Sequence, residues 1–401
     1  MMKLLKGVCM AYDFDTVIER RGTDCIKFDQ AEVRGKSPDL LPLWVADMDF
    51  SLPPEILGPL HDRVEHGIFG YSEPNDDYFE AVHNWFATRY DWDVKRGWAV
   101  FTPGVVFAIG TAIRAFSEPG DNVLIQPPVY YPFKGMIEAN GRTTVTSPLV
   151  YDAETHAYGI DFSAFERVVE EAQPKVFLLC NPHNPGGRVW TADELRRLGD
   201  ICMKHDVIVV SDEIHQDFAR PGYKHEVFAK LDERFAARSV TCTSPSKSFN
   251  IAGLQVSNVF IPDSGLRRRY LAAHRATGYG ELNAIGITAG RACYQHGGPW
   301  LDALKEYLEG NLAFMCDYLA EHAPQLAVVE PQSTYLVWVD CSALGLDDEG
   351  LRQLVEDKAK LWLDMGTMFG KEGSSFIRFN IACPRATLAQ ALEQLAGAIS
   401  G

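Results

Sequence analysis

Short apolar runs alternate with amphipathic stretches through the middle of the chain. Residues 98–102, 122–126, 176–180, 207–210, 239–243 and 256–261 are rich in β-branched and other apolar side chains. Continuous apolar runs of this length are typical of strands that are covered on both faces. Helical patterns separate several of them, at residues 105–116 and 191–205, and Thr191 with Glu194 forms a capping-box pattern. The pattern predicts an α/β fold with a mainly parallel sheet and helices on both faces.

The two ends of the chain differ from the middle. Residues 1–55 are rich in Pro, Asp and aromatic side chains and show few clear elements. After about residue 290, a long helical pattern leads to short strand patterns at 335–339 and 376–380, each followed by a helix. We therefore expect an N-terminal arm (1–55) that also contributes to a small domain, a large ligand-binding domain (56–290) and a small α+β domain (291–401).

Composition and charge argue against several classes of protein. With 46% hydrophobic residues among 401, the chain can bury a large core, whereas a net charge of −16 disfavours binding to nucleic acid or to an anionic membrane. Nine scattered cysteines without a CxxC pair favour reduced thiols in a cytoplasmic protein over a disulfide framework or a metal site. No apolar stretch reaches the length of about 18 residues that a membrane span needs. We expect no metal, no nucleic-acid partner and no membrane partner.

Chemically active residues follow the predicted strands. In an open parallel sheet, ligands bind beyond the carboxyl ends of the strands. Gly104 opens a helix after the first run, where backbone N–H groups and the helix dipole favour an anion. Four later runs are followed by Tyr130, Asn184, Asp212 and Lys247. An anion cradle, an aromatic ring, an amide, a carboxylate and an amine would therefore meet in one crevice.

Each of these residues has an ordinary structural alternative. Tyr130 could pack at a rim, and Asn184 before proline could shape a turn. Asp212 could cap a helix, and Lys247 could be a solvated surface lysine. Because all of them fall at one edge of one sheet, the structural alternative would have to apply at every position at once. The combination therefore favours a ligand site.

Pyridoxal phosphate chemistry requires this combination of groups. A lysine forms an imine with the cofactor, an acid keeps the pyridine nitrogen protonated, and the protonated ring acts as the electron sink. A donor at the 3-oxygen, an aromatic face and an anion cradle complete the set. We infer a pyridoxal-phosphate enzyme that acts on an amino acid, with Lys247 as the Schiff-base lysine.

The spacing of the motifs resembles that of the fold type I pyridoxal-phosphate enzymes, the aspartate aminotransferase superfamily. The motifs are NPGG at 184–187, DEIH at 212–215 and SPSK at 244–247. Within that superfamily, the chain resembles the MalY/PatB-like cystathionine β-lyase (C–S lyase) branch. The segments that carry this likeness span nearly the whole chain: 13–16, 43–50, 67–71, 127–133, 180–187, 211–215, 246–254 and 377–384. The resemblance implies a large domain with a mainly parallel sheet of the seven-stranded type, plus a smaller α+β domain.

The resemblance also implies a role for each cofactor ligand. Lys247 holds the cofactor and acts in catalysis, together with Asp212 at the pyridine nitrogen and Tyr130 stacked on the ring. Asn184 bonds the 3-oxygen. His215 either tunes the ring or fills the site as a neutral imidazole. The phosphate contacts are implied to come from the backbone N–H groups of Gly104, Val105 and Val106 and from Ser244 and Ser246.

Two further implications concern the substrate and a second subunit. Arg378 matches the arginine that clamps a substrate α-carboxylate, with Ala46 and Asn184 beside it, and a planar guanidinium suits that task. The alternative for Arg378 is a structural ion pair of the small domain. Tyr71 matches a tyrosine that reaches the phosphate bound by the neighbouring subunit, which implies a homodimer with shared active sites.

Two departures from the wider superfamily favour the lyase branch. Gln255 stands where many aminotransferases have a phosphate-binding arginine, and His215 stands where many have tyrosine. The implied reaction is β-elimination from a cysteine thioether, which gives pyruvate, ammonia and a thiol. An aminotransferase of class I/II remains open, because both reactions need the same residues, and a regulatory binding protein on the same fold is a further alternative. The sequence leaves the particular thioether open.

Overall fold

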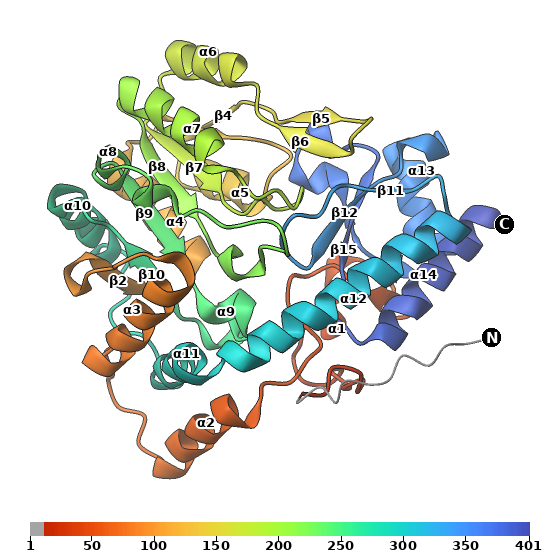
Figure 1. Ribbon diagram of the computed structural model, residues 1–401, viewed down its shortest axis with the longest axis horizontal. Coiled ribbons are helices and arrows are strands. Elements are labelled where there is room, and N and C mark those ends of the chain that lie inside the picture. Colours follow the sequence, from red (N-terminus) through yellow and green to blue (C-terminus); the bar gives the residue numbers. More distant parts are fainter. Residues whose placement is uncertain (1–11) are drawn as a thin grey trace.

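The computed structural model describes residues 12–401 and is built around two β-sheets (Figure 1). The larger sheet has seven strands in the order β2-β10-β9-β8-β7-β3-β4. Strand β10 is antiparallel to both of its neighbours, and the other strands run parallel to one another. The strands are β2 (Ala99–Thr102), β3 (Asn122–Ile125), β4 (Thr143–Thr146), β7 (Val176–Cys180), β8 (Ile208–Asp212), β9 (Ser239–Thr243) and β10 (Ser257–Phe260). The predicted, mainly parallel seven-stranded sheet is confirmed.

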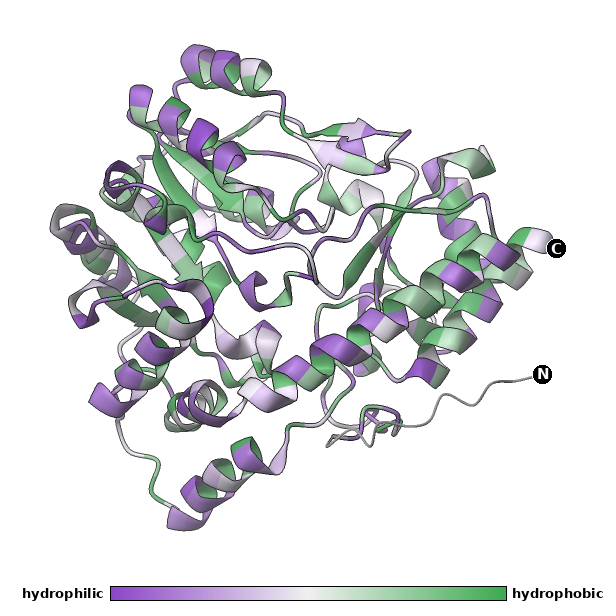
Figure 2. Cartoon of the chain, viewed as in Figure 1, coloured by the Kyte–Doolittle hydropathy of each residue, from purple (hydrophilic) through white to green (hydrophobic). Residues whose placement is uncertain are grey.

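Helices cover both faces of this sheet, as the apolar runs require. In β7, Val176 and Leu178 pack into one core cluster, whereas Phe177 and Leu179 pack into another, because successive side chains of a strand point to opposite faces. Figure 2 shows the strands as hydrophobic and the outer helices as mixed. One face is covered by α4 (Val105–Phe116), α5 (Pro132–Ala139) and α10 (Ser264–Arg275); the other is covered by α6 (Phe162–Ala172) and α7 (Ala192–Lys204).

The smaller sheet lies beside the larger one, at the C-terminal part of the chain (Figure 1). Its order is β11-β12-β15-β14, and every pairing is antiparallel. The strands are β11 (Ala327–Val328), β12 (Leu336–Asp340), β14 (Asp364–Met365) and β15 (Phe376–Asn380). The long helix α12 (Gly298–His322) packs against α11 (Ala284–His296) at one end and against α14 (Arg385–Ser400). It therefore links the two sheets.

The N-terminal arm joins the C-terminal part of the chain. Strand β1 (Leu41–Pro42) pairs in parallel with β13 (Leu361–Trp362). This pairing agrees with an arm that contributes to the smaller sheet region, and the three-part division of the chain stays a prediction. The remaining elements are α1 (Ile26–Asp29), α2 (Pro54–His66), α3 (Asp76–Tyr90), α8 (Glu233–Ala236), α9 (Pro245–Ser248), α13 (Asp348–Arg352) and the hairpin β5 (Val150–Asp152) with β6 (Ala157–Gly159).

The local predictions hold best where a strand is central. The capping box of Thr191 and Glu194 is present at the start of α7. The edge strand β4 and the hairpin β5–β6 are absent from the sequence-based prediction, because their partly exposed residues lack a continuous apolar run. Across residues 12–401, we find no helix with both the length and the apolar character that crossing a membrane requires.

Candidate active site

A pocket of about 220 Å³ lies at the carboxyl ends of the central strands. It brings together residues from the larger sheet, from β15 and from the segment that follows β1. Of the residues that the sequence singles out, the pocket is lined by Ala46, Gly104, Val105, Val106, Tyr130, Asn184, Asp212, His215, Ser246, Lys247 and Arg378. The five residues of the strand-end argument, Gly104, Tyr130, Asn184, Asp212 and Lys247, therefore meet in one crevice.

Lys247 stands on the single turn of α9, directly after β9. Its Nζ donates a hydrogen bond of 2.6 Å to the Ala46 carbonyl oxygen. Burial lowers the pKa of Lys247 to about 8, helped by the positive charge of Arg378, whereas Asp47 acts in the opposite direction. An amine with this pKa is partly unprotonated near neutral pH, so it can act as a nucleophile or as a base.

Asp212 is the last residue of β8 and is almost fully buried. Its Oδ1 accepts a hydrogen bond of 3.2 Å from the Ile214 N–H. Burial raises the pKa of Asp212 to about 7, and the nearby charge of Lys247 only partly opposes this shift. A buried carboxyl group of this kind is stabilised as a carboxylate by a cationic partner.

Arg378 and Asn184 both line the pocket and are in direct contact. Arg378 Nη1 donates to Asn184 Oδ1 at 2.8 Å, and Nη2 donates to the Trp44 carbonyl oxygen at 3.0 Å. Nη2 also forms a buried ion pair with Asp364. The ion pair considered as an alternative is therefore present, but it does not remove Arg378 from the pocket. Within residues 12–401, Arg378 Nε has no hydrogen-bond partner.

The rings of Tyr130 and His215 also line the pocket. The ring of Tyr130 packs edge-on against Phe133, with centroids 5.7 Å apart, and burial raises the pKa of its hydroxyl. His215 lies edge-on to Tyr335 at 6.1 Å. Burial, followed by the charges of Lys247 and Arg378, holds the pKa of His215 well below its usual value. His215 is therefore neutral near neutral pH.

The two serines near the lysine take different positions. Ser246 lines the pocket. Ser244 instead caps α9, since its Oγ accepts from the Ser246 N–H at 3.0 Å and donates to the Val256 carbonyl oxygen at 2.6 Å. Gly104 is the N-cap of α4, and the pocket reaches the first two residues of that helix. The free N–H groups of a helix start can bind an anion there.

Tyr71 lies outside this pocket. Its side chain is 99% exposed, in a separate depression that also includes Phe69 and Leu282. Gln255 is not among the lining residues either.

Sequence reasoning missed several lining residues. Val45, Tyr131 and Ile214 contact the pocket, and each directly adjoins a residue that the motifs did identify. The sequence around Asp364 gave no sign that this residue belongs to the site. Asp364 meets Arg378 only through the pairing of β14 with β15.

The sequence and fold of this chain are similar to those of known proteins. Residues 38–395 match the family model described as aminotransferase class I and II. The chain is 44% identical to cystathionine β-lyase PatB of Bacillus subtilis, over 97% of this chain and 100% of that protein. It is 37% identical to the protein MalY of Escherichia coli, over 97% and 99%. The crystal structure of cystalysin from Treponema denticola, which contains a pyridoxal 5'-phosphate cofactor, superposes with a TM-score of 0.93 at 36% identity, covering 98% of this chain and 99% of that one.

Proposed function

The chain belongs to the aminotransferase class I and II family, and from this membership we propose that it is a pyridoxal-phosphate-dependent C–S lyase. Its substrate is a cysteine thioether such as cystathionine, and its products are pyruvate, ammonia and a thiol. The observation that carries the pyridoxal-phosphate chemistry is that the amine of Lys247, with its lowered pKa, shares one pocket with Asp212 and Arg378. The naming of PatB as a cystathionine β-lyase supports the reaction class.

The residues of the pocket fit pyridoxal phosphate. Asp212 suits a protonated pyridine nitrogen, because a cation there would offset the burial that raises the pKa of this carboxyl. Since Arg378 donates to Asn184 Oδ1, the Nδ2 group of Asn184 remains a donor for the 3-oxygen. Tyr130 offers a ring face, and the start of α4 offers backbone N–H groups for the phosphate. When bound, the cofactor supplies an electron sink for negative charge at the substrate α-carbon.

The chain itself binds the substrate and moves the proton. The guanidinium of Arg378 binds the α-carboxylate of the amino acid, and its Nε, which has no hydrogen-bond partner in the described part of the chain, is an additional donor. Lys247 accepts the α-proton, since its lowered pKa makes it an effective base near neutral pH. The bond between the β-carbon and sulfur then breaks, and the sulfur leaves as a thiolate with the bonding electron pair. The remaining enamine product takes up one water and gives pyruvate and ammonia.

We further propose a homodimer with shared active sites. Tyr71 is almost fully exposed, and the apolar side chains of Val64, Ile68 and Phe69 beside it are also exposed. Such a cluster is typical of a protein–protein contact. If the partner's site needs Tyr71, a mixture of Tyr71→Phe and Lys247→Ala subunits regains activity through hybrid dimers. No recovery, with subunit exchange verified, would contradict shared sites.

A cytoplasmic location is part of the proposal. The eight cysteines within residues 12–401 are free thiols, and six of them are buried. Such cysteines suit a reducing compartment.

The reaction is tested with cystathionine and no added 2-oxo acid. Elimination leaves the cofactor on Lys247 ready for the next substrate, so we expect many turnovers with equal amounts of pyruvate, ammonia and thiol. An aminotransferase would stop after one turnover and resume only when a 2-oxo acid is supplied. That second result would replace the lyase with an aminotransferase on the same site.

A further inference from the structure

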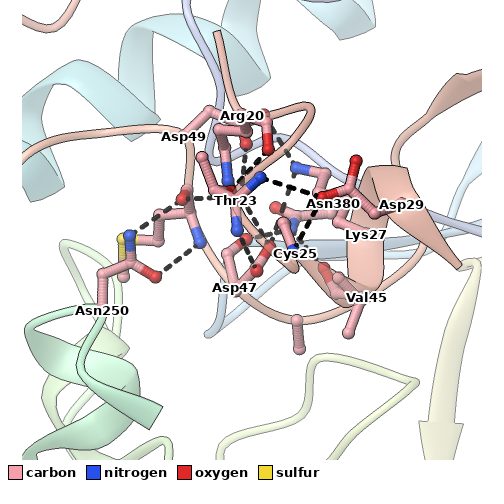
Figure 3. A network of polar contacts seen from close by, with 12 residues as sticks. Arg20, Thr23, Cys25, Lys27, Asp29, Val45, Asp47, Asp49, Asn250 and Asn380 are labelled. Atoms are coloured by element: carbon pink, nitrogen blue, oxygen red, sulfur yellow. Dashed lines mark hydrogen bonds and ion pairs between the residues drawn. The ribbon is translucent and has the colours of Figure 1, made fainter. Parts of the chain in front are cut away.

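We propose that Arg20, on the N-terminal arm, is a positioning residue that holds the amine of Lys247 in its catalytic orientation. It acts through residues 44–50, called the strap below, and the inference rests on the proposed lyase function. Figure 3 shows the polar network that joins Arg20 to the strap. Arg20 itself does not line the active-site pocket.

Arg20 binds the strap through three consecutive residues. Its Nη2 donates to Asp47 Oδ2 at 2.5 Å, and its Nη1 donates to Asp47 Oδ1 and to the Met48 carbonyl oxygen, both at 3.2 Å. Nη1 also reaches Asp49 Oδ1 at 2.7 Å. The forked guanidinium thus fixes two carboxylates and one backbone group at once, which a single point charge cannot do.

Lys27 is a second cation that binds the strap. Lys27 is fully buried, and its Nζ donates to Asp49 Oδ2 at 2.7 Å. The backbone oxygen of Lys27 accepts a hydrogen bond of 3.3 Å from the Trp44 indole. Two cations therefore face two carboxylates, Asp47 and Asp49. Because Lys27 is 3.9 Å from Asp47, Arg20 is the main partner of that carboxylate.

The other side of the strap faces the active site. The Ala46 carbonyl oxygen accepts hydrogen bonds from Lys247 Nζ at 2.6 Å and from the Tyr335 hydroxyl at 3.1 Å. The Trp44 carbonyl oxygen accepts from Arg378 at 3.0 Å. Residues 44 and 46 therefore present their carbonyl oxygens to the two residues that handle the proton and the substrate carboxylate.

The intervening carbonyl groups are held by one side chain of β15. Asn380 Nδ2 donates to the carbonyl oxygens of Val45 at 2.7 Å and Asp47 at 2.5 Å. Further along, Asn250 accepts from the Met48 N–H at 2.9 Å and donates to the Met48 carbonyl oxygen at 2.8 Å. The strap is thus tied to the smaller sheet and to the segment after Lys247, while Arg20 holds its acidic side chains.

The consequence is an indirect link from Arg20 to Lys247 through the strap. Without Arg20, the Asp47 carboxylate keeps Lys27, at 3.9 Å, as its ion-pair partner within residues 12–401. The strap then loses its anchor on the acidic side, although Asn380 and Tyr335 still bind its carbonyl groups. The Ala46 oxygen is then held less firmly, so the amine of Lys247 loses part of its alignment. Small losses of alignment at a reacting group reduce rates by up to about 100-fold.

The test compares Arg20→Ala and Arg20→Lys with Arg21→Ala. Arg21 is the adjacent, exposed arginine. Within residues 12–401 it pairs only with Glu19, at 3.6 Å, and packs over the Phe28 ring, as Arg20 does, so it is a matched control. In Arg20→Ala we expect kcat with cystathionine to fall about 10- to 100-fold, with KM changed less than about threefold. Arg20→Lys should recover part of kcat, and Arg21→Ala should match the wild type.

A second readout does not depend on turnover. Backbone amides of the strap should exchange hydrogen for deuterium faster in both Arg20 variants than in Arg21→Ala, with and without pyridoxal phosphate. If Arg20→Ala does not fold, hydrogen exchange in Arg20→Lys still tests the positioning role. Unchanged exchange in the strap, or a rise in KM alone, would overturn the positioning role. If the wild type lacks lyase activity but the exchange results hold, the proposed reaction fails and the link from Arg20 to the strap stands.

Discussion

The two walls of the pocket are built in different ways. Asn184, Asp212 and Lys247 each lie within four residues of the end of a central strand. The opposite wall depends on Arg378, which meets Asn184 across 194 residues of sequence and Trp44 across 334. The sheet wall is therefore placed by local backbone, whereas the opposite wall exists only after distant segments have assembled.

The walls also differ in their electrostatics. On the sheet wall, burial raises the pKa of Asp212 to about 7 and lowers that of Lys247 to about 8. Both groups therefore change charge near neutral pH. On the opposite wall, Arg378 is neutralised by the buried carboxylate of Asp364. Proton transfer thus belongs to the sheet wall and substrate binding to the other.

The largest effect should come from breaking the sheet wall with Lys247→Ala. The variant loses both the cofactor bond and the base, and general base catalysis alone contributes about 10²–10⁴-fold. We expect turnover of cystathionine to fall by about 10³-fold or more. Pyruvate release measures this, and near-normal release would mean that another residue is the base.

Breaking the opposite wall should separate binding from stability. Arg378→Ala should weaken substrate binding by about 2–5 kcal/mol, which raises KM about 30-fold or more. Asp364→Asn leaves the guanidinium in place but without its counter-charge, so the main loss should be in the free energy of unfolding, by about 3 kcal/mol. Steady-state kinetics and denaturant unfolding measure the two variants. Equal effects of both on KM would contradict this separation.

The rate at which the apo protein binds pyridoxal phosphate should depend on pH through the sheet wall. Only the unprotonated amine of Lys247 attacks pyridoxal phosphate, so binding to the apo protein should quicken as pH rises towards 8 and then level off. Between pH 6 and 8 the unprotonated fraction grows about 50-fold. Stopped-flow absorbance measures the rate, and a rise that continues beyond pH 10 would indicate an ordinary lysine.

The smallest effect should distinguish the two serines. Ser244→Ala removes the cap of α9 and should lower the free energy of unfolding by about 1 kcal/mol, with the affinity for pyridoxal phosphate almost unchanged. Ser246→Ala should mainly weaken cofactor binding. Titration of the apo proteins with pyridoxal phosphate measures both affinities. A larger loss of affinity for Ser244→Ala would instead support the phosphate contact that the resemblance implies for Ser244.

The same contrast explains what the sequence could predict. Lys247, Asp212 and Asn184 could be predicted because apolar runs locate the buried strands. Polar residues that follow such strands face the ligand-binding crevice at the edge of the sheet. The pairing of Asp364 with Arg378 could not be read in this way, since it depends on the register of two short strands. Arg20 gave no indication either, because its partners are 27 and 29 residues away along an irregular segment.

The central claim is that Lys247 carries the cofactor, and reduction with borohydride tests it most directly. Borohydride converts the imine between pyridoxal phosphate and a lysine into a stable amine, so the modified residue can be found by peptide mass spectrometry. We predict one modified site per chain, in the peptide that contains Lys247, with loss of the visible absorption band. Modification of a different lysine, or none in folded protein saturated with pyridoxal phosphate, would contradict the account.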